Sequence, residues 1–183
     1  MTRPVSTRAR TRRISAVEMA VAFALIGSLL AVAVPTFVRE VHASRLVEPV
    51  AGLERLGASA IRYAQAPRPE PGAGAGTPFP SSAPMTPGPP PRGRCDADPP
   101  GAWDHPTWSA LEFRPVPAGT PHCFAFAFDS AASPGQASFR AHAHGDLDGD
   151  GIASTFEVTG RAVDGDPRGP VLDPGMFVDS EDE

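Results

Sequence analysis

One long apolar stretch near the N-terminus dominates the hydrophobic pattern of this chain. From residue 14 to residue 38 the only ionisable side chain is Glu18. At a rise of 1.5 Å per residue this stretch forms a helix of about 37 Å, which is enough to cross a hydrocarbon core of about 30 Å. The pattern therefore predicts a transmembrane helix over residues 14–38.

The hydrophobic period changes in the residues that follow. Between residues 39 and 65 apolar side chains recur at three- and four-residue spacing, which predicts an amphipathic helix. Pro35 and Pro49 lie inside the helical pattern, and each proline removes a helical hydrogen bond and crowds the preceding turn. We therefore expect one long N-terminal helix that is kinked at the prolines.

Beyond this helix the pattern becomes that of a connector and then of a sheet. Proline, glycine, alanine and serine dominate residues 66–94, a composition that cannot bury a core and predicts an extended connector. Short β-type runs separated by turn-forming residues then predict about four antiparallel strands. These runs cover residues 108–113, 122–128, 137–143 and 152–158.

Aromatic residues give the predicted sheet a core. Phe124, Phe126 and Phe128 alternate along one strand and so share one face, and Phe139 and Phe156 are expected to face them. The expected fold class is α+β, with a long kinked N-terminal helix followed by a small antiparallel β-sheet domain over residues 95–162. The acidic tail, residues 163–183, is expected to be irregular.

Charge and cysteine usage indicate where the parts of the chain lie. Five arginines occupy residues 1–13, and such a basic flank stays on the cytoplasmic side of a membrane, which sends the remainder outward. Cys95 and Cys123 both fall in the exported part, where an oxidising compartment favours one disulfide. From Cys95 onward acidic residues outnumber arginines sixteen to four. We therefore expect this part to bind no nucleic acid.

The stretch from Ile14 to Pro35 resembles the N-terminal segment of type IV pilins and pseudopilins. Glu18 and Pro35 stand at the glutamate-to-proline spacing of that superfamily. The resemblance implies cleavage by a prepilin peptidase between Arg13 and Ile14. It also implies a methylated N-terminus that pairs with Glu18 when subunits pack into a filament, so that Glu18 and Pro35 are assembly residues. The superfamily has glycine where this chain has Arg13, which leaves open a membrane-retained relative that does not polymerise.

Several segments of the second half are similar to pilin-like fimbrial proteins of myxobacteria and related bacteria. The resemblance implies a non-enzymatic structural subunit of a type IV pilus, held in the inner membrane with a periplasmic domain and displayed at the cell surface once assembled. Its partners would be other pilin subunits, the assembly platform and the peptidase. The segments are residues 79–87, 108–113, 123–128, 145–151 and 173–178.

Other interpretations of the N-terminal stretch stay open. A cleaved secretory signal would use Ala31-Val32-Ala33 as its site, and the pair Arg12-Arg13 permits twin-arginine export. A type II secretion pseudopilin would share the fold and serve protein export. A further alternative is an inner-membrane-anchored periplasmic module that binds calcium and does not polymerise.

The calcium alternative depends on one acidic loop. Asp146, Asp148 and Asp150 alternate before Gly151, and Glu157 follows at the last position of the EF-hand loop pattern. These four carboxylates are the candidate ligands for Ca²⁺. The flanking runs are β-type where an EF-hand has helices, so an acidic β-turn is the competing interpretation.

Two further patterns bear on function. His142 and His144 would share one face of a strand, a spacing that suits transition metals, although solvent-exposed strand histidines are the commoner case. A nucleophile with a base and an orienting acid is not recognisable, because Ser81 and Ser82 lie in the connector without such partners. We therefore expect no enzymatic activity.

Overall fold

The computed structural model describes residues 15–66, 77–90 and 92–180. The chain divides into two compact units, residues Met1–His42 and Ala43–Glu183, and each is described by itself. We call the second of these the head unit. The predicted leader, residues 1–13, and the predicted cleavage site between Arg13 and Ile14 lie outside the described residues.

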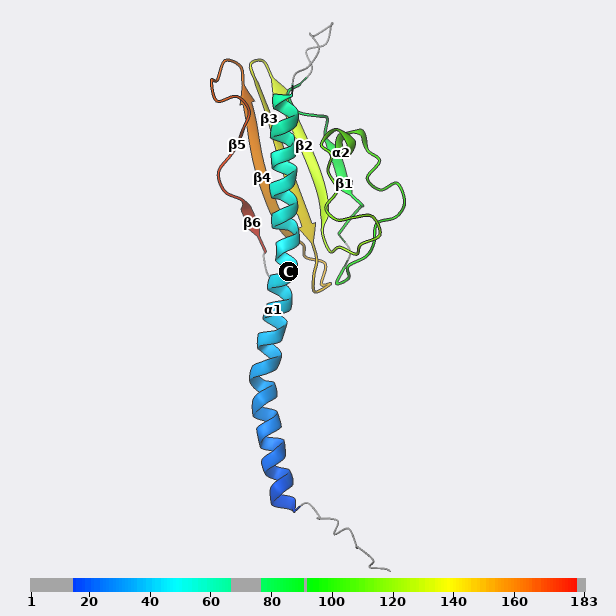
Figure 1. Cartoon of the computed structure of the whole chain (residues 1–183), viewed down its shortest axis with the longest axis vertical. Helices are drawn as coiled ribbons and strands as arrows, with labels where there is room; N and C mark the ends of the chain where they lie inside the picture. The colour runs from blue at the N-terminus through cyan, green and yellow to red at the C-terminus, as the bar shows by residue number, and fades with distance from the viewer. Residues whose placement is uncertain (1–14, 67–76, 91, 181–183) are drawn as a thin grey trace, which may run out of the picture. The chain divides into compact units, whose positions relative to one another are not determined.

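The longest element is the helix α1, which comprises Ala16–Gln65 (Figure 1). Its first part belongs to the first unit, and the part from Ala43 onward belongs to the head unit. The helix is assigned without interruption across Pro35 and Pro49. The long helix is therefore confirmed, whereas the kinks at the two prolines are not confirmed.

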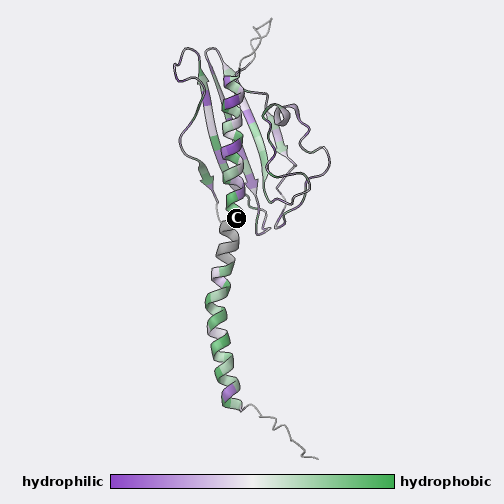
Figure 2. Ribbon diagram, in the orientation of Figure 1, coloured by the Kyte–Doolittle hydropathy of each residue, from purple (hydrophilic) through white to green (hydrophobic). Residues whose placement is uncertain are grey.

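The first part of α1 is apolar on all sides. Ala16–Phe37 is long and apolar enough to cross a membrane by length and composition, and Figure 2 shows most of this stretch coloured as hydrophobic, with a hydrophilic band near its start. Its large side chains are exposed, as at Phe23 and Leu29. Ser28 and Thr36 donate their hydroxyl hydrogens to carbonyls of the same helix, each at 2.8 Å, so their polar atoms are satisfied without water.

The head unit is built on one antiparallel sheet, which confirms the α+β prediction. The strand order is β1-β2-β3-β4-β5, and β6 pairs with β4 as well. The long central strands β2, β3 and β4 carry most of the pairing, and short strands lie at the edges (Figure 1). The strands are β1 (Ala83–Thr86), β2 (Ala125–Ser133), β3 (Gln136–Gly145), β4 (Ser154–Val163), β5 (Val171–Leu172) and β6 (Phe177–Asp179).

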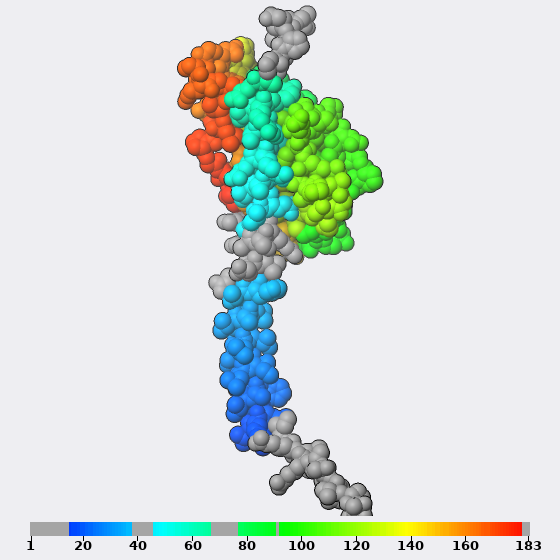
Figure 3. All heavy atoms as spheres, viewed as in Figure 1, coloured from blue at the N-terminus to red at the C-terminus, as the bar shows by residue number. Residues whose placement is uncertain are grey.

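One face of this sheet packs against α1. Phe124, Phe126 and Phe128 are buried together, with Phe156 at 5.8 Å from Phe124 and Phe139 at 5.3 Å from Phe128, measured between ring centroids. The predicted aromatic face is thus confirmed. Figure 3 shows the second part of α1 lying between the C-terminal strands and the segments around a short helix, α2 (Pro106–Ala110). From this part of the helix Leu53, Leu56 and Ala60 are completely buried.

The strand predicted over residues 108–113 is wrong, because these residues form a short helix and a turn. The helix α2 comprises Pro106–Ala110, with proline at its first position and the His105 side chain accepting the Thr107 N–H. Trp108 is then buried, and its indole donates to Thr86 Oγ1 at 2.9 Å. Local capping therefore overrides the β-type composition.

The prediction of a connector without a core over residues 66–94 is wrong for its described second half. Phe79 is buried, with its ring centroid 4.9 Å from that of Phe139, and β1 pairs with β2 at the edge of the sheet. A proline is tolerated on an edge strand because the missing donor interrupts no ladder, and Pro84 lies in β1. One aromatic side chain and one edge pairing thus order a proline-rich segment.

The count of about four strands is also wrong, because the described residues form a sheet of six strands. Two of them, β5 and β6, lie in the tail over residues 163–183, which we expected to be irregular. Both pair with β4, where Leu172 stands opposite Gly160 and Phe177 opposite Glu157. Strands of two and three residues carry no alternating pattern, so their pairing depends on the exposed edge of β4.

We predict that Gly52→Ala destabilises the head unit. A Cβ atom at Gly52 would lie 2.6 Å from the ring of Phe126, which is fixed in the core, so the clash outweighs the gain of about 1 kcal/mol in helix propensity. The matched control is Gly57→Ala in the same helix, whose Cβ would lie 2.9 Å from the flexible end of Leu172 and at ordinary contact distance, 3.7 Å, from Val158. Thermal unfolding of the full chain in detergent should give a lower Tm for Gly52→Ala than for Gly57→Ala. Equal melting temperatures would contradict the close helix–sheet packing.

Candidate functional site

Glu18 forms a capping box at the start of α1. The Ser15 N–H donates to Glu18 Oε2 at 2.8 Å, and the Glu18 N–H donates to Ser15 Oγ at 3.2 Å. These bonds satisfy two backbone donors at the end of the helix, and the carboxylate also lies favourably at the positive end of the helix dipole. This capping was not predicted, although Ser15-Ala-Val-Glu18 has the spacing that signals it.

A buried cluster of charges joins α1 to the segments around the disulfide. Its centre is His122, whose side chain is 2 % exposed, and its Nε2 lies 2.6 Å from Oδ1 of Asp98. His122 Nδ1 lies 2.8 Å from the Phe124 carbonyl oxygen and 3.6 Å from Glu48 Oε1. The cluster brings together residues that lie far apart in the sequence, so no motif signalled it.

The geometry determines the protonation of His122. Carbonyl and carboxylate oxygens only accept hydrogen bonds, so both ring nitrogens carry hydrogens and the ring is an imidazolium. Burial opposes this charge, but the hydrogen bonds and charges of Glu48 and Asp98 outweigh burial and raise the pKa of His122 to about 9. With both nitrogens engaged, this histidine has no lone pair with which to act as a general base.

Glu48 also ties the helix to the disulfide. Its carboxylate accepts the backbone N–H of Cys123 at 3.1 Å and that of Phe124 at 3.0 Å. Cys123 forms the predicted disulfide with Cys95, which is thereby confirmed. The cluster and the disulfide therefore hold the start of β2 and one turn of α1 together.

The Asp98 carboxylate has further partners besides His122. It accepts a hydrogen bond from the Trp103 indole at 2.8 Å, and the Arg114 guanidinium lies 3.8 Å away. Two carboxylates, one imidazolium and one guanidinium make the cluster neutral, with the His122 and Asp98 side chains buried and Arg114 partly exposed at its rim. Within the described residues every buried side-chain nitrogen and oxygen atom has a hydrogen-bond partner.

The acidic loop between β3 and β4 brings three of its carboxylates together. Asp146, Asp148 and Asp150 each offer an oxygen, and these oxygens all lie within 4.8 Å of one another. The buried Asp146 accepts the N–H of Gly149 at 2.7 Å and that of Gly151 at 3.1 Å, which shapes the loop. Clustered carboxylate oxygens are ligands that Ca²⁺ prefers, so the donor set permits this ion.

Glu157, the fourth predicted ligand, lies elsewhere. It is in β4, opposite His142 of β3, and its Oε1 lies 3.2 Å from Nε of Arg140. In an EF-hand the last ligand returns to the ion from a helix, whereas here the chain leaves the loop as an extended strand. The metal-capable group in the described residues is therefore the three aspartates without Glu157.

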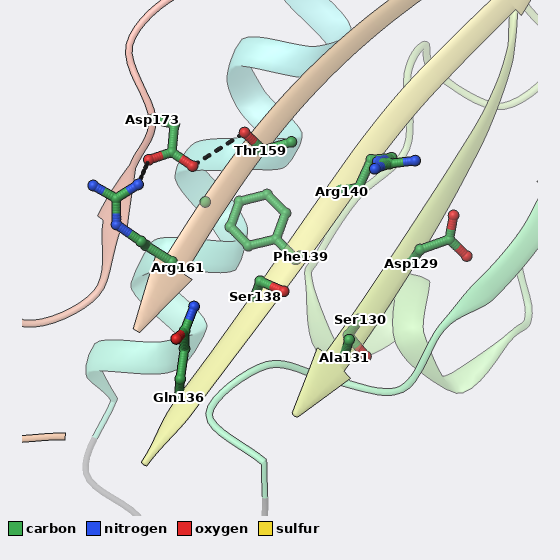
Figure 4. Close-up of a pocket in the computed structure, with 11 residues that line it drawn as sticks. Asp129, Ser130, Ala131, Gln136, Ser138, Phe139, Arg140, Thr159, Arg161 and Asp173 are labelled. Carbon is green, nitrogen blue, oxygen red and sulfur yellow. Dashed lines mark hydrogen bonds and ion pairs between the residues drawn. The ribbon is translucent and has the colours of Figure 1, made fainter. Parts of the chain in front are cut away.

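The outer face of the sheet, opposite α1, carries charges of both signs around a shallow hollow (Figure 4). Arg161 pairs with Asp173, which also accepts the Thr159 hydroxyl at 3.1 Å. Arg140 lines the same hollow and pairs with Glu157. These cations are already paired, so the hollow offers little to an anionic ligand.

Comparisons with protein-family models, with curated proteins and with solved structures found no match to this chain. Three features carry chemistry: the capped apolar helix with Glu18, the charge cluster at His122 and the acidic loop.

We predict that the charge cluster makes stability depend on pH between about 6.5 and 9. The pKa of His122 is raised in the folded state, so its contribution is complete below the unfolded value near 6.5 and is lost as the pH rises through about 9. The contribution is on the order of 3 kcal/mol. Urea unfolding of the full chain in detergent should show wild-type protein losing stability over this range.

The control for this prediction is His122→Gln. This variant should be less stable at pH 6 and should have lost most of the pH dependence, because glutamine does not titrate. If wild-type protein and variant lose stability in parallel from pH 6.5 to 9.5, the charge on His122 does not stabilise the fold.

Proposed function

We propose that this chain is a pilin-like structural subunit of a type IV pilus or of a related secretion filament. In this proposal the apolar part of α1 anchors it in the inner membrane, and the head unit lies in the periplasm before assembly. The main observation that supports this proposal is the division of one helix into two parts. Its residues Ala16–Phe37 are apolar with exposed side chains, and its later residues cover an antiparallel sheet. Such a helix needs lipid or other helices around its first part.

The position of Glu18 supports assembly over simple anchoring. A carboxylate costs roughly 2.5–3.5 kcal/mol at the centre of a membrane helix, and in a plain anchor Glu18 would serve only to cap the helix. In a bundle of such helices the charge would pair with a positive group, and the free amine of Ile14 after processing is the candidate. An unpaired buried charge would be costly, so this pairing would select one axial register between subunits.

Capping by Glu18 is the competing explanation, and three substitutions separate the two. Glu18→Gln keeps a side chain that can cap the helix but removes the charge, Glu18→Ala removes both, and Ser15→Ala weakens the cap and keeps the charge. We predict that both Glu18 variants reduce incorporation into filaments at least tenfold relative to wild-type protein. Ser15→Ala should be incorporated. The measurement is the amount of the subunit in sheared surface filaments relative to the membrane fraction.

The same samples provide a control at the N-terminus. Intact mass of the wild-type subunit from filaments should correspond to a chain that begins at Ile14 with one methyl group. The proposal would be wrong if Glu18→Gln were incorporated at the wild-type level and the mass of the wild-type subunit included Arg13. Glu18 would then be a capping residue of a membrane-retained protein.

Calcium binding by the acidic loop is a second candidate function, which we propose because the structure gathers three of the four predicted ligands. Asp146, Asp148 and Asp150 would supply three carboxylate oxygens, and water would complete the coordination. The ion would neutralise mutual repulsion in the loop and so stabilise the connection between β3 and β4. A non-polymerising, membrane-anchored calcium module is the alternative function that this site would serve.

We predict that calcium raises the Tm of the full chain by roughly 5 °C at a concentration one hundred times its Kd. Asp148→Asn should abolish the rise, because it removes a charged ligand but keeps the Oδ1 atom that accepts the Asp150 N–H at 3.0 Å. The control is Asp164→Asn, an exposed acid outside the loop. If neither calcium nor a chelator changes the Tm, the acidic loop does not bind calcium.

A further inference from the structure

Two histidines stand side by side on the outer face of the sheet. His142 and His144 alternate in β3 with the buried Ala141 and Ala143, so both imidazoles point away from α1. Their ring centroids are 5.1 Å apart and the planes are inclined at 67°. Both residues are half-buried, and the His142 side chain is 18 % exposed, so the rings are held and still reachable from solvent.

Neighbouring strands place an oxygen near Nδ1 of each ring, within hydrogen-bond distance at His144 and farther away at His142. Thr155 Oγ1 of β4 lies 2.9 Å from Nδ1 of His144, and Asp129 Oδ2 of β2 lies 3.7 Å from Nδ1 of His142. With the hydrogen on Nδ1 of each ring, as when the Thr155 hydroxyl accepts it from His144, the lone pair lies on Nε2. Histidines that bind metal ions in proteins are oriented in this way by a second group.

The surrounding charge favours a cation. Glu157 stands opposite His142 in the register of β3 and β4, and Asp129 lies on the other side. Arg140 is the nearby positive group, and it is engaged with Glu157 at 3.2 Å. This pairing occupies Glu157, so the two imidazoles are the candidate ligands and Asp129 adds a negative charge beside them.

We propose that His142 and His144 together bind a borderline divalent transition-metal ion, with Zn²⁺ as the representative ion, through their Nε2 atoms. Small rotations of the two rings bring the nitrogens to one ion, and water fills its other positions. Imidazole ligands suit zinc, copper and nickel and disfavour calcium, so this site is chemically distinct from the acidic loop. The proposal does not depend on filament assembly.

The test is a titration of the full chain in detergent with zinc chloride alone, followed by calorimetry. His142→Gln and His144→Gln should each weaken zinc binding at least tenfold, because each removes one of two ligands. Asp148→Asn, which alters the acidic loop, should leave zinc binding unchanged. Zinc binding that is unaffected by either histidine variant, or the absence of binding at 1 mM zinc, would overturn the proposal.

A second measurement works on the wild-type protein and does not require the variants to fold. Diethyl pyrocarbonate labels free imidazoles, and trypsin releases residues 141–161 as a peptide that contains only these two histidines. Zinc should reduce labelling of this peptide at least fivefold. The peptide of residues 95–140, which carries His105 and His122, is the internal control and should be unchanged. Equal labelling of the 141–161 peptide with and without zinc would reject the site.

Discussion

The contact between the later residues of α1 and the phenylalanine-rich face of the sheet is the interaction on which the head unit depends. Phe126 lies against the helix backbone on one side and against Trp103 and Phe113 on another, so the helix and the segments around α2 cover the phenylalanine-rich face together. The contact is close because Gly52 lets the Phe126 ring approach the helix backbone. The edge strands and α2 then pack around this helix–sheet pair, as Figure 3 shows.

Polar contacts give this apolar packing a defined register. Hydrophobic burial is non-directional, so it tolerates sliding of a helix along a sheet. Glu48 removes this freedom, because its carboxylate accepts two adjacent backbone N–H groups at Cys123 and Phe124. His122 and Asp98 complete a neutral cluster beside the disulfide, so the same few residues join helix, strand and covalent link.

Prediction from the sequence succeeded where a segment was long enough to show a regular spacing of hydrophobic residues. The helix α1 and the strands β2, β3 and β4 carry periodic patterns and were each located, although the predicted ends of β2 and β4 fall five residues before the observed ones. The failures at Trp108, at β1 and at β5 have a common cause. These segments are short, and a cap, an edge pairing or one buried aromatic side chain decides their structure.

The candidate sites divide in the same way. The acidic loop, the cysteine pair and the position of Glu18 in the apolar helix were evident from the sequence, because their chemistry depends on residues that are close in the chain or on the compartment. The tertiary structure alone decided that Glu157 lies away from the loop and that Glu48, Asp98 and His122 form one buried cluster. Strand register and helix packing bring such distant groups together, and these depend on the whole core rather than on any local pattern.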